Sequence, residues 1–181
     1  YHILERLGRG GLSQVYQARH ADYGWQVALK VLRAESLANS QGRRQFFQEM
    51  EAMAKLDHPN IVQFCDVDQA GDTFYFAMEF IAGADLGKHV ALAGPVSVPA
   101  ACDYVRQAAL GLQHAHERNL VHRDIKPVNL FLTHVRAPAP APLAARTRPL
   151  LRPLIKILDW GLACLRFPRG VPATTMLETM S

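Results

Sequence analysis

Short runs of alternating apolar and polar residues fill the first third of the chain. Residues 1–20 predict two strands around a glycine-rich turn, and residues 25–32 predict a third strand. Two further strands are expected at 58–67 and 73–81, on either side of the turn DQAGD. These runs indicate an N-terminal region built mainly of strands.

Helical spacing occurs in two places. The first predicted helix spans about 41–56, where apolar residues at i, i+4 and i+7 form one inward stripe: Phe46, Met50 and Met53. The pattern is then interrupted by Gly83, Gly87 and Pro95. A long helix is expected to start near Pro99, which suits a first turn, and to run to Arg118. Asn119 tolerates the left-handed conformation that ends many helices.

The segment 133–153 differs in composition from the rest of the chain. It lies between two short apolar runs, 129–133 and 154–158, and contains five prolines, four arginines and no acid. This composition predicts a solvated loop or insertion, not a packed element. Without those four arginines, the 20 basic residues fall to 16 and equal the 16 acids. The body is therefore neutral, and we expect no nucleic-acid partner.

The bulk numbers set further limits. A chain of 181 residues that is 49% hydrophobic and 20% charged fits one domain or a two-lobed unit. No apolar run has the length of a membrane span, so no membrane segment is expected in this chain. Cys65, Cys102 and Cys164 have no paired spacing, which favours free thiols in a reducing, cytoplasmic setting. The start lacks Met, as expected for a segment of a longer chain.

The stretch HRDIKPVN holds the densest polar chemistry, directly after the long helix. Asp124 could accept a proton from a hydroxyl, and Lys126 could neutralise a transferring phosphoryl group. Asn129 and a second acid could hold Mg²⁺, which prefers oxygen ligands. The second acid is a candidate in KILDWGLAC, where Asp159 could also be a plain strand end. His122 is expected to be a packed structural residue.

Two other places suggest phosphate chemistry but leave alternatives open. Gly8 and Gly10 fit either a turn that approaches a phosphate closely or a simple hairpin turn. Lys30 shares a strand face with Ala28, and it is either a solvated lysine or a cation near a ligand. Glu49 lies in the inward stripe of the first helix and needs a cation if buried, for which Lys30 is the candidate. Otherwise Glu49 lies at the edge of the stripe and reaches water.

Together these motifs resemble the eukaryotic-type protein kinase family, from residue 7 to about residue 163. The resemblance rests on LGRGGLSQVY, VALK, Glu49, MEF, HRDIKPVN and DWG in this order. Lys126 in HRDIKP resembles the residue found at this place in the serine/threonine subgroup, and the sequence as a whole resembles bacterial members of the family. Ser13 and Leu12 depart from the usual phosphate loop, and Trp160 replaces the common Phe.

The resemblance implies an α+β, two-lobed fold. It implies an N-lobe at 1–82, with a nucleotide-binding sheet and a regulatory helix. A partial C-lobe would follow at 83–181, with the catalytic loop, the insertion 133–153 and the start of an activation segment. Family members continue with a large helical bundle, so the chain is expected to be a fragment or a truncated product.

The resemblance also implies a nucleotide site. Gly8, Gly10 and the backbone to Val15 would cover the phosphates of ATP, and Lys30 paired with Glu49 would contact the α- and β-phosphates. The adenine would lie among Val15, Ala28, Phe131 and Met78. The backbone from Glu79 to Ile81 would offer hydrogen bonds, and Asp85 would meet the ribose.

The implied chemistry is ATP- and Mg²⁺-dependent phosphoryl transfer to serine or threonine hydroxyls of a protein substrate. Asp124 would orient the hydroxyl, Lys126 would reach the γ-phosphate, and Asn129 with Asp159 would hold the metal. The alternative is a pseudokinase-like module that binds ATP without transferring phosphate. A small-molecule phosphotransferase of related fold is disfavoured by HRDIKP and HPNIV. The sequence indicates neither the substrate protein nor a dimer or regulatory partner.

Overall fold

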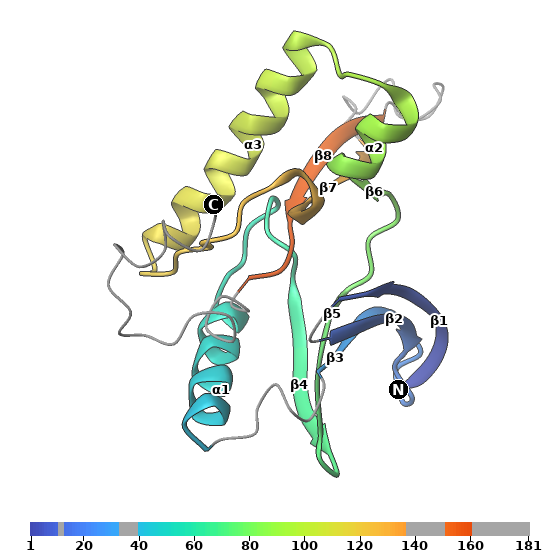
Figure 1. Cartoon of the computed structure of the whole chain (residues 1–181), viewed down its shortest axis with the longest axis vertical. Coiled ribbons are helices and arrows are strands. Elements are labelled where there is room, and N and C mark those ends of the chain that lie inside the picture. The colour runs from blue at the N-terminus through green and yellow to red at the C-terminus, as the bar shows by residue number, and fades with distance from the viewer. Residues whose placement is uncertain (11–12, 33–39, 137–150, 161–181) are drawn as a thin grey trace, which may run out of the picture.

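The computed structural model describes residues 1–10, 13–32, 40–136 and 151–160. Figure 1 shows two lobes arranged along the long axis of the molecule, with a five-stranded sheet in one and the longest helix in the other. The predicted α+β, two-lobed fold is confirmed. The predicted lobe boundary at residue 82 falls between Glu79, where the sheet ends, and Ala84, where the next element begins.

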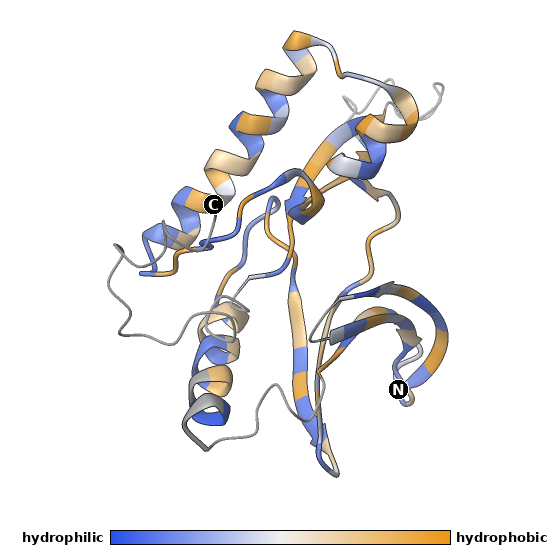
Figure 2. Cartoon of the chain, viewed as in Figure 1, coloured by the Kyte–Doolittle hydropathy of each residue, from blue (hydrophilic) through white to orange (hydrophobic). Residues whose placement is uncertain are grey.

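The first lobe contains an antiparallel sheet with the strand order β1-β2-β3-β5-β4. Its strands are β1 (His2–Arg9), β2 (Ser13–Arg19), β3 (Gln26–Leu32), β4 (Phe64–Ala70) and β5 (Thr73–Glu79). Central β3 is buried over most of its length, as a strand covered on both faces must be. Outer β1 is almost fully exposed. The alternation of hydrophobic and hydrophilic residues along the strands is visible in Figure 2.

The predicted strand 58–67 is wrong in its first half, because β4 begins only at Phe64. The preceding residues instead bond to the second lobe. Ile61 forms an isolated parallel bridge with Ile157, and Val62 N donates to the carbonyl of Ile157 (3.1 Å). The apolar residues that looked like a strand are therefore buried in an inter-lobe loop.

The first helix, α1, spans Ser40–Ala54 and lies beside β4 in Figure 1. Phe46 and Met50 are fully buried, and Met53 is 6% exposed. The predicted inward stripe is thus confirmed, and the helix ends within two residues of the expected limits.

The second lobe contains a small sheet with the order β6-β7-β8 and the helices α2 and α3. Their bounds are β6 (Ala84–Asp85), α2 (Leu86–Ala93), α3 (Val98–His116), a 3₁₀ turn (Pro127–Asn129), β7 (Leu130–Arg136) and β8 (Leu151–Ile157). Helix α3 and the left-handed Asn119 that follows it (φ 61°) confirm the prediction. Helix α2 was missed. Asp85 caps it by accepting from Lys88 N (2.8 Å), which stabilises a short helix despite Gly87.

The predicted loop 133–153 is too long at both ends. Strands β7 and β8 form a hairpin whose register continues from Leu130↔Ile157 to His134↔Pro153 and Arg136↔Leu151. Pro153 fits because β8 is an edge strand of this sheet, where a missing N–H is tolerated. Residues 137–150 lie outside the described part of the chain.

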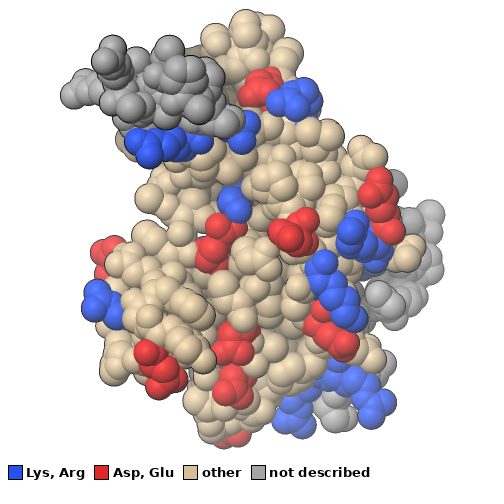
Figure 3. Space-filling view, turned by 180° about the vertical axis from the view of Figure 1, so that it is seen from behind, with Lys and Arg blue, Asp and Glu red and all other residues tan. Residues whose placement is uncertain are grey.

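One hydrophobic cluster joins the two lobes. It combines Leu32, Phe46 and Phe64 of the first lobe with Ile157 and Trp160 of the second. On the face drawn in Figure 3, basic and acidic side chains are interspersed, as a neutral body predicts. Among the described residues, no helix is both long enough and apolar enough to cross a bilayer.

Candidate active site between the lobes

The site contains a buried lysine paired with an acid from the other lobe. Lys30 of β3 is 2% exposed, and its Nζ lies 2.6 Å from Asp159 Oδ1. The ammonium also lies 5.9 Å from the centre of the Phe76 ring on the neighbouring strand. The Asp159 side chain is 41% exposed, so this carboxylate faces both the lysine and solvent. The interpretation of Lys30 as a solvated lysine is therefore wrong.

Asp159 has a left-handed backbone conformation (φ 60°) two residues after the end of β8. A non-glycine residue in this region is uncommon and costs energy, although aspartate tolerates it better than most residues. The conformation bends the chain out of the strand and aims the carboxylate at Lys30. Asp159 is thus more than the polar end of a strand.

The loop HRDIKPVN brings its three predicted chemical groups together. Lys126 Nζ lies 2.9 Å from Asp124 Oδ2, and Asn129 Nδ2 donates to Asp124 O (2.7 Å) and to Asp124 Oδ2 (3.2 Å). The side chains of Lys126 and Asp124 are 42% and 37% exposed. A carboxylate held by two donors, yet open to solvent, can meet a substrate hydroxyl.

Asn129 links this loop to the strand that carries Asp159. It is 5% exposed, and its backbone carbonyl accepts from Leu158 N (2.9 Å). Its amide nitrogen is used on Asp124, which orients the amide so that its oxygen is the atom able to ligate a cation. An amide oxygen and the carboxylate of Asp159 are oxygen donors of the type that Mg²⁺ binds, so this donor set fits the expected metal.

His122 supports the loop from behind. Its side chain is 2% exposed, its Nε2 lies 2.8 Å from the carbonyl oxygen of Leu158, and its ring packs edge-on against Trp160 (4.8 Å). Burial lowers the pKa of His122 below its ordinary value, so the neutral ring donates to Leu158. The prediction of a packed structural histidine is confirmed. Trp160 anchors its own indole nitrogen on Ile157 O (3.2 Å).

The predicted nucleotide-binding residues of the first lobe share one region of its sheet. Val15 lies opposite Gly8 on one neighbouring strand and opposite Lys30 on the other, and Ala28 lies opposite Met78. Ala28 and Met78 are 8% and 7% exposed, and Val15 packs on the same hydrophobic cluster. Ala28 and Lys30 lie two positions apart on β3, as the sequence indicated, and the adenine contact of Ala28 stays a prediction.

The glycine turn is described only in part. Gly8 follows an irregularity in the β1–β2 register, and Gly10 N donates to Ser13 O (2.8 Å). A Cβ placed on Gly8 would meet nothing within 4 Å. Gly8 therefore borders open space, where a phosphate could approach the backbone. Leu12 lies outside the described residues.

Three residues that were predicted to contact the nucleotide lie at or near the segment that connects the two lobes: Ile81, Asp85 and Phe131. Phe131 pairs with Asp85 across β6 and β7, so both lie beside the inter-lobe chain. Asp85 is 7% exposed, and its carboxylate also holds Lys88 Nζ (3.5 Å). Its ribose contact stays a prediction, and the structure adds a role as the cap of α2. Ile81 is half-buried against the main cluster.

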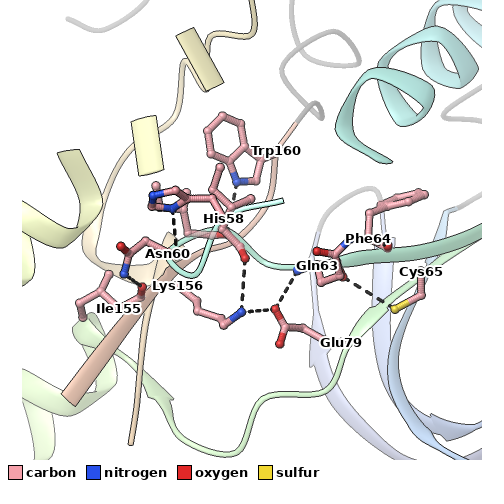
Figure 4. A network of polar contacts seen from close by, with 11 residues as sticks. His58, Asn60, Gln63, Phe64, Cys65, Glu79, Ile155, Lys156 and Trp160 are labelled. Atoms are coloured by element: carbon pink, nitrogen blue, oxygen red, sulfur yellow. Dashed lines mark hydrogen bonds and ion pairs between the residues drawn. The ribbon is translucent and has the colours of Figure 1, made fainter. Parts of the chain in front are cut away.

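Glu79 belongs to a polar network that the sequence did not indicate. Figure 4 shows its carboxylate between Gln63 N (2.7 Å) and Lys156 Nζ, with Lys156 reaching from β8. Glu79 N donates to the carbonyl of Gln63 (2.9 Å), so that N–H is used within the lobe. The network fixes the end of β5, from which the predicted adenine contacts continue.

Glu49 is half-buried on α1, beside fully buried Met50. This position agrees with a residue at the edge of the inward stripe. Its pairing with Lys30 stays a prediction.

The sequence reading also missed a buried polar junction between the lobes. Asn60 Nδ2 donates to Gln107 Oε1 (3.1 Å) and to the carbonyl of Ile155 (2.8 Å), while Gln107 Oε1 accepts from Ile155 N (2.9 Å). Asn60 and Gln107 are 5% and 7% exposed. A glutamine on the inward face of α3 was the available signal. Gly111 lets α3 approach, because a Cβ there would lie 2.9 Å from the side chain of Ile157.

Fold and site together place the chain among protein kinase domains. Residues 1–180 match the family described as protein kinase domain, and the chain belongs to this family. The resemblance to the serine/threonine subgroup and to its bacterial members is confirmed by relatives from bacteria. The chain is 35% identical over 181 residues to the serine/threonine-protein kinase PrkC of Bacillus subtilis, and 33% identical over 177 residues to PknF of Mycobacterium tuberculosis.

Solved structures show the same fold. The kinase domain of Mycobacterium tuberculosis PknI matches 87% of this chain with a TM-score of 0.66 and 28% identity. Rad53 in complex with AMP-PNP matches 88% of the chain with a TM-score of 0.69 and 28% identity. The chain covers 58% and 38% of those two structures, and 24% of PrkC and 34% of PknF. It therefore spans about a quarter to a third of the length of these two bacterial relatives.

Proposed function

We propose that the full-length protein containing this chain transfers the γ-phosphoryl group of ATP to serine or threonine hydroxyls of a protein substrate, with Mg²⁺. The observation that carries this proposal is the meeting of two groups between the lobes. One is the buried Lys30–Asp159 pair (2.6 Å), and the other is the Asp124–Lys126–Asn129 cluster. Phosphoryl transfer requires a cation for the phosphates, a carboxylate base and oxygen ligands for a metal.

Each residue has a role that its environment supports. Asp124 would accept the proton of the attacking hydroxyl as its oxygen bonds to the γ-phosphorus and ADP leaves. Lys126, whose Nζ pairs with Asp124 Oδ2 in this structure, would turn to the phosphoryl oxygens. Lys30 would hold the α- and β-phosphates. Mg²⁺ would supply charge neutralisation of the phosphates, and the oxygens of Asn129 and Asp159 are its proposed ligands.

The remaining predicted contacts are proposed for the nucleotide. Gly8 and Gly10 would cover the phosphates, while Val15, Ala28, Met78 and Phe131 would enclose the adenine. Glu79 to Ile81 would supply backbone hydrogen bonds, and Asp85 would meet the ribose. Because Cys65 and Cys102 are free and exposed, we propose a reducing, cytoplasmic setting for this domain.

A radiolabel transfer assay on the full-length protein tests the proposal. Lys30→Met removes the phosphate-binding cation and is expected to abolish measurable transfer to a generic protein substrate. Lys55→Met is a matched control, because the side chain of Lys55 is 70% exposed on the lobe surface and pairs with exposed Glu51. Transfer by Lys30→Met at the unmutated rate would contradict the proposal.

The second candidate function is ATP binding without phosphoryl transfer. The apolar side chains that α3 and the loop after it present to solvent, including Val98 (76%), Val105 (67%) and Val121 (60%), suit a binding module that docks on a partner. A thermal-shift titration with ATP and Mg²⁺, run beside the transfer assay, separates the two functions. Stabilisation by nucleotide with no transfer in the unmutated full-length protein would select the second.

A further inference from the structure

A row of aromatic side chains, exposed at Tyr23 and Trp25 and half-buried elsewhere, lies on the first lobe away from the proposed active site. We call Tyr1, His20, Tyr23, Trp25 and Tyr75 the aromatic row. Tyr23 and Trp25 stack on each other (4.8 Å between centroids, 22° between planes) and remain 70% and 55% exposed. The row continues through His20 to Tyr1 (5.0 Å) and from Tyr1 to Tyr75 (6.1 Å).

The backbone holds this row in place. The turn between β2 and β3 is closed by His20 N donating to Trp25 O (2.9 Å) and by Gly24 N donating to His20 O (3.0 Å). Gly24 has φ 75°, which few residues adopt without strain. The closed turn leaves two stacked rings in water, so the apolar surface of these rings is not buried within the lobe. An exposed aromatic surface of this kind suggests that a partner covers it.

Acids line the aromatic row. Asp66 accepts from the Tyr1 hydroxyl (3.0 Å), Asp68 accepts from the Tyr75 hydroxyl (3.3 Å), and Asp22 lies beside His20 with its side chain 83% exposed. Burial and the neighbouring carboxylates raise the pKa of both tyrosines, so their hydroxyls remain donors that fix these acids. The surface is therefore both aromatic and acidic.

The segment 137–150, APAPAPLAARTRPL, has the complementary composition. It contains four prolines, two arginines and no acid. Proline-rich peptides dock on aromatic-lined surfaces because their extended backbone loses little entropy on binding, and flanking arginines pair with acids. Among the sequence features described above, this segment is the one that the proposed function leaves without a role.

We propose that the aromatic row and its acids bind the proline- and arginine-rich segment 137–150 of a second copy of this chain. Arg136 and Leu151 pair at the end of the β7–β8 hairpin, so both ends of the segment are anchored there. A segment of this length reaches at most about 25 Å from its anchors, half of its extended length. Figure 1 shows the hairpin and the N-terminus, where Tyr1 lies, well apart along the long axis of the molecule, which favours a second copy over the same one.

The first test uses a fluorescein-labelled peptide of residues 137–150 and the full-length protein, with binding followed by anisotropy. The double variant Tyr23→Ala/Trp25→Ala is expected to weaken binding at least tenfold. Asp22→Lys is expected to weaken it severalfold, with a smaller dependence on salt. Leu92→Ala is the matched control, because Leu92 is 88% exposed on α2 and lies outside the aromatic row.

A second peptide separates the proposal from simple charge attraction. It keeps both arginines and replaces the four prolines by serine. Weak binding of this peptide supports recognition of proline. Equal binding of the two peptides, or equal binding of the proline peptide to the protein with and without Tyr23 and Trp25, overturns the proposal.

Self-association of the full-length protein gives a complementation test by sedimentation. One variant carries Tyr23→Ala/Trp25→Ala, and another replaces residues 138–149 by a Gly/Ser linker of equal length, which preserves hairpin closure. Each alone is expected to associate less than the unmutated protein. Their mixture is expected to regain association, since one supplies the intact segment and the other the intact surface. No gain on mixing would overturn docking between copies.

Discussion

Two polar clusters near β8 differ in how far water reaches them. At the inter-lobe junction, Asn60 and Gln107 are 5% and 7% exposed, and they bond to each other and to Ile155. Gln107 Nε2 also donates to Asp103 Oδ2 (2.7 Å), and the carbonyl of Asn60 accepts from Ile157 N (2.9 Å). In the catalytic loop, Asp124 and Lys126 have side chains 37% and 42% exposed. The buried amides therefore hold the lobes together, whereas the half-exposed charges of Asp124 and Lys126 remain available to a ligand. Substitutions in the two clusters should therefore affect different properties.

The largest expected effect is on catalysis. Asp124→Asn removes the carboxylate that would accept the hydroxyl proton, and phosphoryl transfer is expected to fall about 10³-fold, within the range for a lost general base. The thermal midpoint should change little, because an asparagine keeps an amide oxygen that can accept from Asn129, and the side chain of Lys126 is 42% exposed. Steady-state transfer assays and thermal denaturation of the same full-length variant measure both. The control is Glu117→Gln, an exposed acid at the end of α3 that accepts from exposed Gln113. A large loss of stability in Asp124→Asn would contradict the expectation that substitutions in the two clusters affect different properties.

The next effect is on stability. Asn60→Ala removes the donor to Gln107 Oε1 and to Ile155 O, and we expect the free energy of unfolding to fall by about 2 kcal/mol, the cost of leaving buried polar groups without a partner. Denaturant titration measures it. Gln113→Ala is the control, because Gln113 is exposed on α3, the helix that carries Gln107, and bonds to Glu117. If the two variants lose equal stability, the junction does not hold the lobes together.

A smaller effect concerns pH. Because burial holds the pKa of His122 below its ordinary value of 6.5, the unfolded chain takes up a proton below about pH 6.5 that the folded protein does not. The stability contribution is complete above about pH 6.5 and is lost as the pH falls towards the folded pKa. His122→Gln is expected to flatten the dependence of unfolding free energy on pH below about pH 6.5.

Exposed His134→Gln is the control for that measurement, since His134 lies on the surface of the hairpin. Part of the slope remains in both variants, because burial and His114 also lower the pKa of His58. An unchanged slope in His122→Gln would show that the catalytic loop does not depend on a neutral ring at this position.

The smallest effect comes from a pair that belongs to neither cluster. Glu51 and Lys55 on α1 lie 3.3 Å apart with side chains 72% and 70% exposed. Glu51→Gln is expected to change the free energy of unfolding by less than about 0.5 kcal/mol, as for other solvated i,i+4 pairs. A result near that of Asn60→Ala would mean that burial does not determine the cost. Chemical denaturation of both variants under one set of conditions provides the comparison.

Local patterns predicted the parts of this fold that depend on local physics. The stripe of Phe46, Met50 and Met53 indicated the buried face of α1, and the position of Asn119 indicated where the chain turns after α3. Asp124, Lys126 and Asn129 were found because the chemistry of phosphoryl transfer requires those groups close together in one loop. Asp159 lies on another element, and its role followed from the whole set of motifs and not from its neighbours.

The features that the sequence did not reveal depend on contacts between distant residues. Asn60 and Gln107 are 47 positions apart, and their bond exists only once α3 packs under the inter-lobe loop. The apolar residues Ile61 and Val62 looked like a strand, because burial against β8 requires the same residue types as burial within a sheet. Helix α2 was hidden by Gly87, whose cost is offset by the cap from Asp85.

The hydrophobic cluster that joins the lobes also has a consequence for how the molecule melts. Ile157 and Trp160 from β8 and its end share one apolar cluster with Leu32 and Phe46 of the first lobe. Neither lobe can therefore lose its packing without exposing side chains of the other. Differential scanning calorimetry of this region should show a single heat-absorption peak whose van't Hoff and calorimetric enthalpies agree. We therefore expect the two lobes, although separate in outline, to unfold as one cooperative unit.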